Sequence, residues 1–157
     1  MRYTLGHKGA CPVSPSVETQ LAIEEALGLK NPKTYSELRR KVERSRDELM
    51  GLLTNLKRQG KRVVGYGATS KSTTVTNYCG ITPDLLDYMS DTTPIKQGKF
   101  SPGTHIPIRP HSEFEADYPD YALLFAWNHG EEIMAKEQRF RESGGKFIVY
   151  VPTVQVV

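Results

Sequence analysis

The residues best suited to chemistry form one short run of small and polar residues, Gly65-Tyr66-Gly67-Ala68-Thr69-Ser70-Lys71. It lies between an apolar segment and a segment of helical character. In an α/β protein, such a turn directs the unpaired N–H groups of a helix N-terminus toward an anion. Gly65 and Gly67 permit a tight turn, while Ser70 and Lys71 add donors. The run predicts a phosphate- or pyrophosphate-binding loop, although the glycines also suit a close strand-to-helix turn without a ligand.

The run departs from both common nucleotide-binding patterns. The dinucleotide-binding pattern has a third glycine where this chain has Ser70, and the P-loop pattern has a glycine before its lysine, again at Ser70. Asp91 ends the next predicted strand. An acidic residue at such a position accepts hydrogen bonds from a ribose in dinucleotide-binding proteins. It equally suits a cap for the turn Thr92-Thr93-Pro94, and both roles remain open.

Two later segments also follow predicted strands. The loop 96–105 begins at Lys96, contains Gly98 and ends at His105. Loops at the carboxyl ends of strands often bind ligands, whereas a lone histidine is commonly structural. In the segment Ala126-Trp127-Asn128, the tryptophan is suited to stack on a base or sugar and the asparagine to hydrogen-bond it. Alternatively, its tryptophan fills the core and its asparagine caps the following helix. No pattern indicates a catalytic nucleophile–base pair, and two cysteines cannot form a zinc cluster.

Alternating strand and helix patterns after residue 60 place these segments in one fold. Apolar strands are predicted at 62–66, 85–90, 106–108, 121–126 and 146–151, with helices at 70–79 and 130–142. Strands that are apolar on both faces are typical of a parallel sheet covered on both sides. The prediction is an α/β fold, Rossmann-like, with a mainly parallel sheet covered by helices.

The first 60 residues read as an N-terminal helical extension. We expect an irregular arm or linker at 1–15, helices over 16–60 and the Rossmann-like domain at 61–157. The second helix is predicted to open with a capping box, Thr34 to Glu37. Its apolar stripe comprises Leu38, Val42, Leu49, Leu52, Leu53 and Leu56. The stripe is expected to pack on the domain's own sheet, with a second copy or another domain as the alternative.

Composition excludes several broad classes of protein. With 157 residues, 38% hydrophobic and 25% charged, the chain matches one ordinary globular domain. The net charge of +3 is modest, and the basic residues alternate with acidic ones at helical spacing, which disfavours nucleic-acid binding. No apolar run is long enough to cross a bilayer, and the N-terminus lacks the apolar segment of a signal peptide. We therefore expect a cytoplasmic protein without a membrane partner.

An ordered set of motifs resembles a known family over essentially the whole chain. The motifs are Gly65-Tyr66-Gly67-Ala68-x-x-Lys71, Asn77-Tyr78-Cys79-Gly80-Ile81, Lys96-Gln97-Gly98-Lys99, Pro102-Gly103-Thr104-His105-Ile106-Pro107-Ile108, Ala126-Trp127-Asn128-His129-x-Glu131-Glu132-Ile133 and Gly144-Gly145-Lys146-Phe147-Ile148-Val149. This set resembles the C-terminal domain of S-adenosylmethionine-dependent sugar C-methyltransferases from deoxysugar pathways.

This resemblance implies one part of a three-part enzyme. The family's enzymes combine a zinc-binding module, a central S-adenosylmethionine domain and a C-terminal Rossmann-like domain. They methylate the carbon beside a ketone in a nucleotide-linked keto-deoxysugar, through an enolate that attacks the methyl sulfonium. This chain looks like the third part alone, and Met1-Arg2-Tyr3 is similar to the junction after the central domain. We therefore expect no cofactor bound by this part, and no methyl transfer from it alone.

Motifs and resemblance together predict the ligand site. Its ligand would be a nucleotide-linked sugar of the dTDP type, held beside the S-adenosylmethionine-binding domain of the same parent chain. The expected binding residues are Gly65, Tyr66, Gly67, Ala68, Thr69, Ser70, Lys71, Asp91, Lys96, Gly98, His105 and Asn128. Two other functions remain possible. One is a free-standing NAD(P)-type dinucleotide-binding protein, and the other is a non-catalytic interaction module, including a homo-oligomer, that docks through the leucine stripe.

Overall fold

The computed structural model describes residues 4–157, so the resemblance at Met1–Tyr3 lies outside the described residues. The chain forms two compact units, residues 1–42 and residues 43–157. Within the described residues, no helix combines the length and the apolar character needed to cross a membrane. The smaller unit contains α1 (Pro15–Ala26) and the beginning of α2 (Pro32–Arg58).

The start of α2 differs from the predicted capping box. The helix begins at Pro32, and the side chain of Asn31 accepts a hydrogen bond from the backbone N–H of Lys33 at 3.0 Å. Thr34 lies inside the helix and donates to the carbonyl of Gly28 at 2.9 Å. The predicted cap at Thr34 is therefore wrong. An asparagine followed by proline is a favourable helix start, because proline is already set to the helical φ and has no N–H to satisfy.

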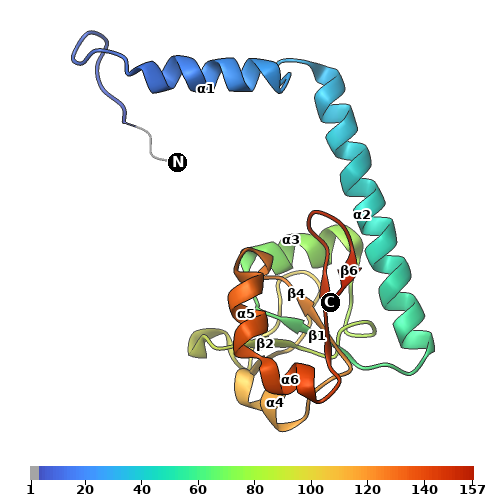
Figure 1. Cartoon of the computed structure of the whole chain (residues 1–157). Helices are drawn as coiled ribbons and strands as arrows, with labels where there is room; N and C mark the ends of the chain where they lie inside the picture. The colour runs from blue at the N-terminus through green and yellow to red at the C-terminus, as the bar shows by residue number, and fades with distance from the viewer. Residues whose placement is uncertain (1–3) are drawn as a thin grey trace. The chain divides into compact units, whose positions relative to one another are not determined.

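The larger unit is built on a six-stranded sheet with the order β3-β2-β1-β4-β5-β6 (Figure 1). Strands β1 to β5 are parallel and β6 is antiparallel to β5. The strands are β1 (Val63–Tyr66), β2 (Met89–Asp91), β3 (Ile108–Pro110), β4 (Tyr121–Leu124), β5 (Lys146–Val149) and β6 (Gln155–Val156). This confirms the predicted mainly parallel α/β fold, although β6 was not predicted. The strand order reverses between β1 and β4, and α/β folds bind ligands beside such a reversal.

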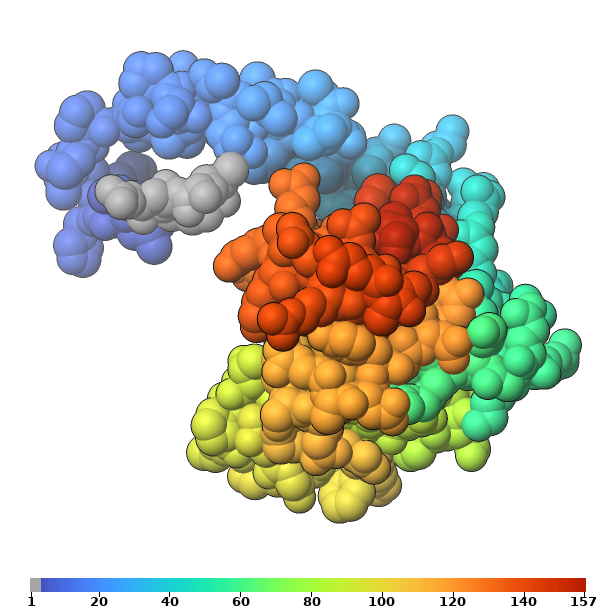
Figure 2. Space-filling model, turned by 60° about the horizontal axis from the view of Figure 1, so that its bottom comes forward, coloured from blue at the N-terminus to red at the C-terminus, as the bar shows by residue number. Residues whose placement is uncertain are grey.

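Helices cover both faces of this sheet, as its alternating side chains require. On one face, Leu53 of α2 packs with Val63 and Leu123, together with residues of α3 (Ser70–Cys79). On the other face, Phe114, Phe140 and Phe147 form an aromatic cluster with Val64 and Leu124. The helices there are α4 (His111–Ala116), α5 (Gly130–Lys136) and α6 (Gln138–Glu142). Figure 2 shows the orange α4 segment beside the red-orange α5–α6 segment.

The leucine stripe of α2 is only partly used by the sheet. Leu49, Leu53 and Leu56 are buried, which confirms packing against the domain's own sheet for this half of the stripe. Leu38 and Val42, by contrast, are 57% and 45% exposed.

The predicted helix 130–142 is interrupted at Glu137, which separates α5 from α6. The Glu137 carboxylate is buried and accepts a hydrogen bond from the Tyr66 hydroxyl at 2.8 Å. Its Oε1 also lies 3.1 Å from Nε2 of His111, whose Nδ1 is 3.0 Å from Oγ of Ser90. A single predicted helix is therefore wrong here. The backbone breaks where Glu137 turns its carboxylate inward to these polar groups.

The strand predicted at 85–90 is also shorter than expected. Leu85 and Leu86 belong to a turn before β2, and their amides donate to the carbonyl of Thr82. Leu86 is nevertheless fully buried, so its apolar character reflects the core and not a strand.

Replacing Leu53 by alanine should destabilise the larger unit by about 2–5 kcal/mol, because the substitution leaves a cavity between α2 and the sheet. Leu38→Ala, on the exposed part of the same stripe, should change stability by less than about 0.5 kcal/mol. Urea unfolding followed by circular dichroism measures both variants. Equal losses for the two would contradict the described packing of α2.

Candidate functional site

A cavity of about 390 Å³ opens beside the turn that follows β1. One wall is the start of α3, and the other is the segment 95–102, while Met89 and Ile108 line it from β2 and β3. The lining residues are Ala68, Thr69, Ser70, Ser72, Thr73, Met89, Ile95, Lys96, Lys99, Phe100, Ser101, Pro102 and Ile108. Four predicted site residues therefore line it, namely Ala68, Thr69, Ser70 and Lys96.

The wall at α3 presents backbone donors. The Thr69 side chain caps α3 by accepting from the N–H of Ser72 at 3.1 Å. The amides of Ser70 and Lys71, in the first turn, have no carbonyl partner within the helix. The positive end of the helix dipole adds to their attraction for an anion. This end of the cavity therefore suits a negatively charged group.

The two glycines of the turn have different roles. Gly67 has a φ of 91°, a conformation that strains residues with a side chain. Gly65 lies within β1, where an added Cβ would come within 2.8 Å of the Phe125 ring. Gly65 thus allows close packing in the core, and Gly67 makes the turn toward α3.

Asp91 fastens this turn to the opposite wall of the cavity. Its Oδ2 accepts from the Ala68 N–H at 2.8 Å and from Nζ of Lys96 at 3.2 Å. Its Oδ1 accepts from the N–H of Thr93 at 2.8 Å. Lys96 also donates to the Ala68 carbonyl at 2.9 Å, and it ends the short helix η1 (Pro94–Lys96). Asp91 therefore caps its own turn, and a contact with a ribose remains a prediction.

These hydrogen bonds also determine the protonation of Asp91. Burial alone would raise the pKa of the carboxyl, because it disfavours the charged form. The hydrogen bonds from Thr93, Lys96 and Ala68 outweigh burial and hold the pKa of Asp91 below its ordinary value. Asp91 and the three groups that donate to it therefore form a clamp between the two cavity walls. The Asp91 carboxylate in this clamp is ionised at neutral pH.

Lys99 also lines the cavity, although it is not among the binding residues predicted from the sequence. Its side chain is exposed, and its ammonium group has no hydrogen-bond or ion-pair partner in the part of the chain that the structure describes. Phe100 and Ile95 flank it with 61% and 74% of their surfaces exposed. The sequence predicts Lys96 as the binding lysine of this loop, but the ammonium group of Lys96 is paired with the Asp91 carboxylate. Lys99 is thus the cation in this cavity that is available to an anionic ligand.

Two other predicted residues meet beside the reversal of strand order. Lys71 donates to Oδ1 of Asn128 at 2.9 Å, and its Nζ lies 5.7 Å from the centroid of the Trp127 ring. Trp127 and Asn128 belong to η2 (Trp127–His129), which follows β4. Trp127 is 38% exposed, and His129 occupies the N-cap position of α5. The alternatives of a core tryptophan and a capping Asn128 are therefore wrong.

The remaining predicted residues lie outside the cavity lining. The Tyr66 side chain packs on the opposite face of the sheet, where burial and then the bond to Glu137 raise the pKa of its hydroxyl. Gly98 and His105 belong to the loop after η1 and have positive φ values of 72° and 54°.

This loop is fastened to α3 by Asn77, which was not selected as a site residue. Its side chain donates to the Pro102 carbonyl at 2.9 Å and to the Thr73 carbonyl at 2.8 Å. A Cβ at Gly103 would overlap the Asn77 side chain, so the loop approaches α3 only because residue 103 is a glycine. Asn77 therefore maintains one wall of the cavity.

Comparison with known proteins shows the family of this sequence. The C-methyltransferase C-terminal domain family matches residues 1–152. The chain belongs to this family. Among curated proteins, C-methyltransferase NovU of Streptomyces niveus is 39% identical over 145 residues. The matched segment is 92% of this chain and 34% of NovU, so the chain spans about a third of the length of that C-methyltransferase.

Asp91→Asn should destabilise this family member by about 1–3 kcal/mol at pH 7, because the amide replaces an ionised acceptor shared by three donors. A carboxyl with a lowered folded pKa stabilises the fold above its unfolded pKa and loses that contribution as the pH falls through the folded pKa. The difference between wild type and variant should therefore shrink below about pH 4. Urea unfolding at pH 7 and below pH 4 measures this difference.

The matched control is Asp84→Asn, an exposed aspartate before β2. It should leave stability within about 0.5 kcal/mol of wild type at pH 7. A loss for Asp91→Asn that is the same at every pH would contradict the ionised clamp.

Proposed function

We propose that this chain is the sugar-nucleotide-binding part of an S-adenosylmethionine-dependent C-methyltransferase acting on a nucleotide-linked keto-deoxysugar. The observation that carries the proposal is the cavity beside α3, which is lined both by the first turn of that helix and by Lys99, whose ammonium group is available. A diphosphate has the charge and the acceptors that this arrangement needs. Membership of the C-methyltransferase family supports the reaction class.

A nucleotide sugar of the dTDP type would use the two walls differently. Its phosphates would accept hydrogen bonds from the amides of Ser70 and Lys71 and from Lys99. The exposed ring of Phe100, at the cavity edge, offers a surface on which a base can stack. Asp91 would act indirectly, since its hydrogen bonds hold the two walls together.

The cavity does not fit the methyl donor. S-adenosylmethionine carries a net positive charge, and its sulfonium would meet Lys99 and the positive end of α3 without a carboxylate among the described lining residues to balance it. We infer that the donor and the base that forms the enolate belong to the S-adenosylmethionine-binding domain of a longer parent chain. The one-third coverage of NovU supports this division.

The dinucleotide-binding alternative has less support. The carboxylate expected to hold a ribose already accepts three hydrogen bonds inside the protein. No described contact of the cavity favours NAD(P) over a sugar nucleotide, and membership of the C-methyltransferase family supports the sugar nucleotide.

Lys99→Ala should weaken the binding of dTDP-glucose by roughly 10- to 100-fold, because a charge-assisted hydrogen bond to phosphate is lost. The salt dependence of binding should also become flatter, since one cation no longer contacts the ligand. Isothermal titration calorimetry at two salt concentrations measures both effects. Lys57→Ala, an exposed lysine at the end of α2, is the control and should bind like wild type.

Unchanged affinity in Lys99→Ala would remove this lysine from the site. A parallel titration with NAD and S-adenosylmethionine tests the proposed ligand class. Binding of NAD without binding of dTDP-glucose would overturn the proposal and favour a dinucleotide-binding protein.

The chain alone should transfer no methyl group when it is mixed with S-adenosylmethionine and a dTDP-linked 4-keto-deoxysugar, because its cavity repels the donor. Mass spectrometry of the sugar nucleotide measures the product. Turnover by this chain would refute the assignment of donor and base to another domain.

A further inference from the structure

Helix α1 has no packing partner that would account for its stability. It is 12 residues long, and none of its residues is buried. A helix of this length is marginal in water, because nucleation costs more than a few backbone hydrogen bonds return. Most helices gain their stability from packing an apolar face. A surface outside α1 must therefore supply that packing.

One side of α1 exposes two apolar side chains with acidic neighbours. Val17 and Leu21 are four residues apart, so they lie on the same side of the helix, with 45% and 59% of their surfaces exposed. The helix contains Glu18, Glu24 and Glu25 and no basic residue. Glu25 pairs with Lys30 at 2.7 Å, while Glu18 and Glu24 place negative charge beside Leu21.

The beginning of α2 offers the opposite combination. Tyr35, Leu38 and Val42 continue the leucine stripe, and they are 54%, 57% and 45% exposed. Residues 32–42 contain four basic residues against one acidic residue. The basic residues are Lys33, Arg39, Arg40 and Lys41, and the acidic one is Glu37. This surface is therefore apolar with basic neighbours, and it complements the face of α1.

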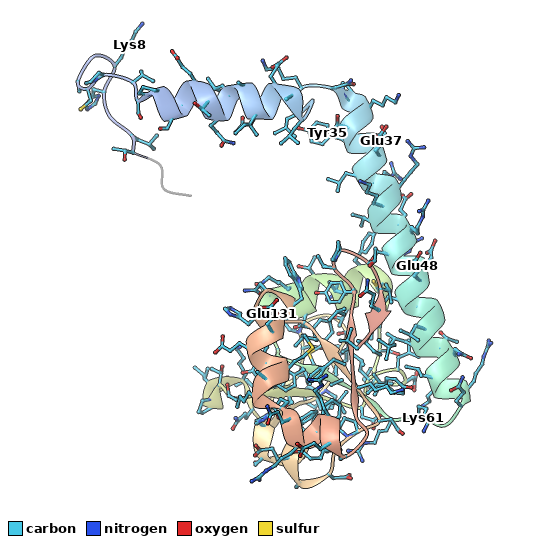
Figure 3. All side chains as sticks on the ribbon, viewed as in Figure 1. Lys8, Tyr35, Glu37, Glu48, Lys61 and Glu131 are labelled. Atoms are coloured by element: carbon cyan, nitrogen blue, oxygen red, sulfur yellow. The ribbon has the colours of Figure 1, made fainter. Side chains whose placement is uncertain are left out.

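The turn between the two helices prevents them from pairing within one chain. Thr34 donates to the carbonyl of Gly28, and the Tyr35 hydroxyl donates to the carbonyl of Leu29. Gly28 is in the left-handed conformation, with φ 66°. These contacts hold α1 pointing away from the start of α2, whose Tyr35 and Glu37 are labelled in Figure 3. The complementary faces are both left open.

We propose that a second copy of this chain covers them, with α1 of each copy packed on residues 32–42 of the other. A two-fold dimer requires that each copy offer both halves of the contact, and this chain carries both. The exchange places Glu18 and Glu24 of one copy opposite the basic residues of the other. It gives Leu21, Leu38 and their neighbours the apolar partner that they lack.

Sedimentation equilibrium of the full chain over a range of concentrations tests the proposal. Wild type should be a dimer at micromolar concentration, and Leu21→Asp or Leu38→Asp should raise the dimer dissociation constant at least tenfold. Ile95→Asp is the control, since Ile95 is an apolar residue that is even more exposed, at 74%, but lies in the larger unit. It should leave the dimer intact. Unfolding by urea should show that the larger unit keeps its stability in all three variants.

Charge exchange gives a second readout. Arg40→Glu with Lys41→Glu should weaken the dimer, and adding Glu18→Lys with Glu24→Lys should restore it, because the complementarity is then reversed on both sides. A chain that is monomeric at every concentration would overturn the proposal. The proposal would also be overturned if Leu21→Asp left the dimer unchanged. The same holds if the chain with all four charge substitutions remained as weakly associated as the chain with Arg40→Glu and Lys41→Glu.

Discussion

The cavity depends on one buried carboxylate. Removing a charged group from water is costly unless hydrogen bonds replace those it loses, so Asp91 holds each of its three donors in place. These donors belong to the turn after β1, to the turn after β2 and to η1. Because β1 and β2 are neighbours in the sheet, their carboxyl ends bring the turns within reach of a single aspartate. The separation of the cavity walls follows from this clamp.

The sequence predicted the part of the fold that depends on local pattern. Strands β1 and β4 are runs without a charged residue, β5 has three apolar residues after Lys146, and all three lie within the predicted ranges. The break at Glu137 was missed because it depends on Tyr66 and His111, which are distant in sequence and close only after folding. Strand β6 has two residues, whose extended form depends on pairing with β5. Such features leave no periodic signal.

The candidate site was predictable as a region but not residue by residue. The glycine turn and the loop after β2 were both expected to face a ligand, and they do line one cavity. Nothing in the sequence distinguishes the roles of Lys96 and Lys99, because the difference depends on which ammonium reaches Asp91. Lys71 and Asn128 come from distant segments, and their contact follows from the pairing of β1 with β4.

The contact between Asn77 and Gly103 has a consequence for how such sequences can diverge. A side chain at position 103 would need the space that the Asn77 amide occupies, while loss of that amide would release the Pro102 carbonyl from α3. The two positions are therefore constrained as a pair. Among relatives that keep this loop, we expect substitutions at 77 and 103 to occur together, and glycine at 103 to persist wherever asparagine does.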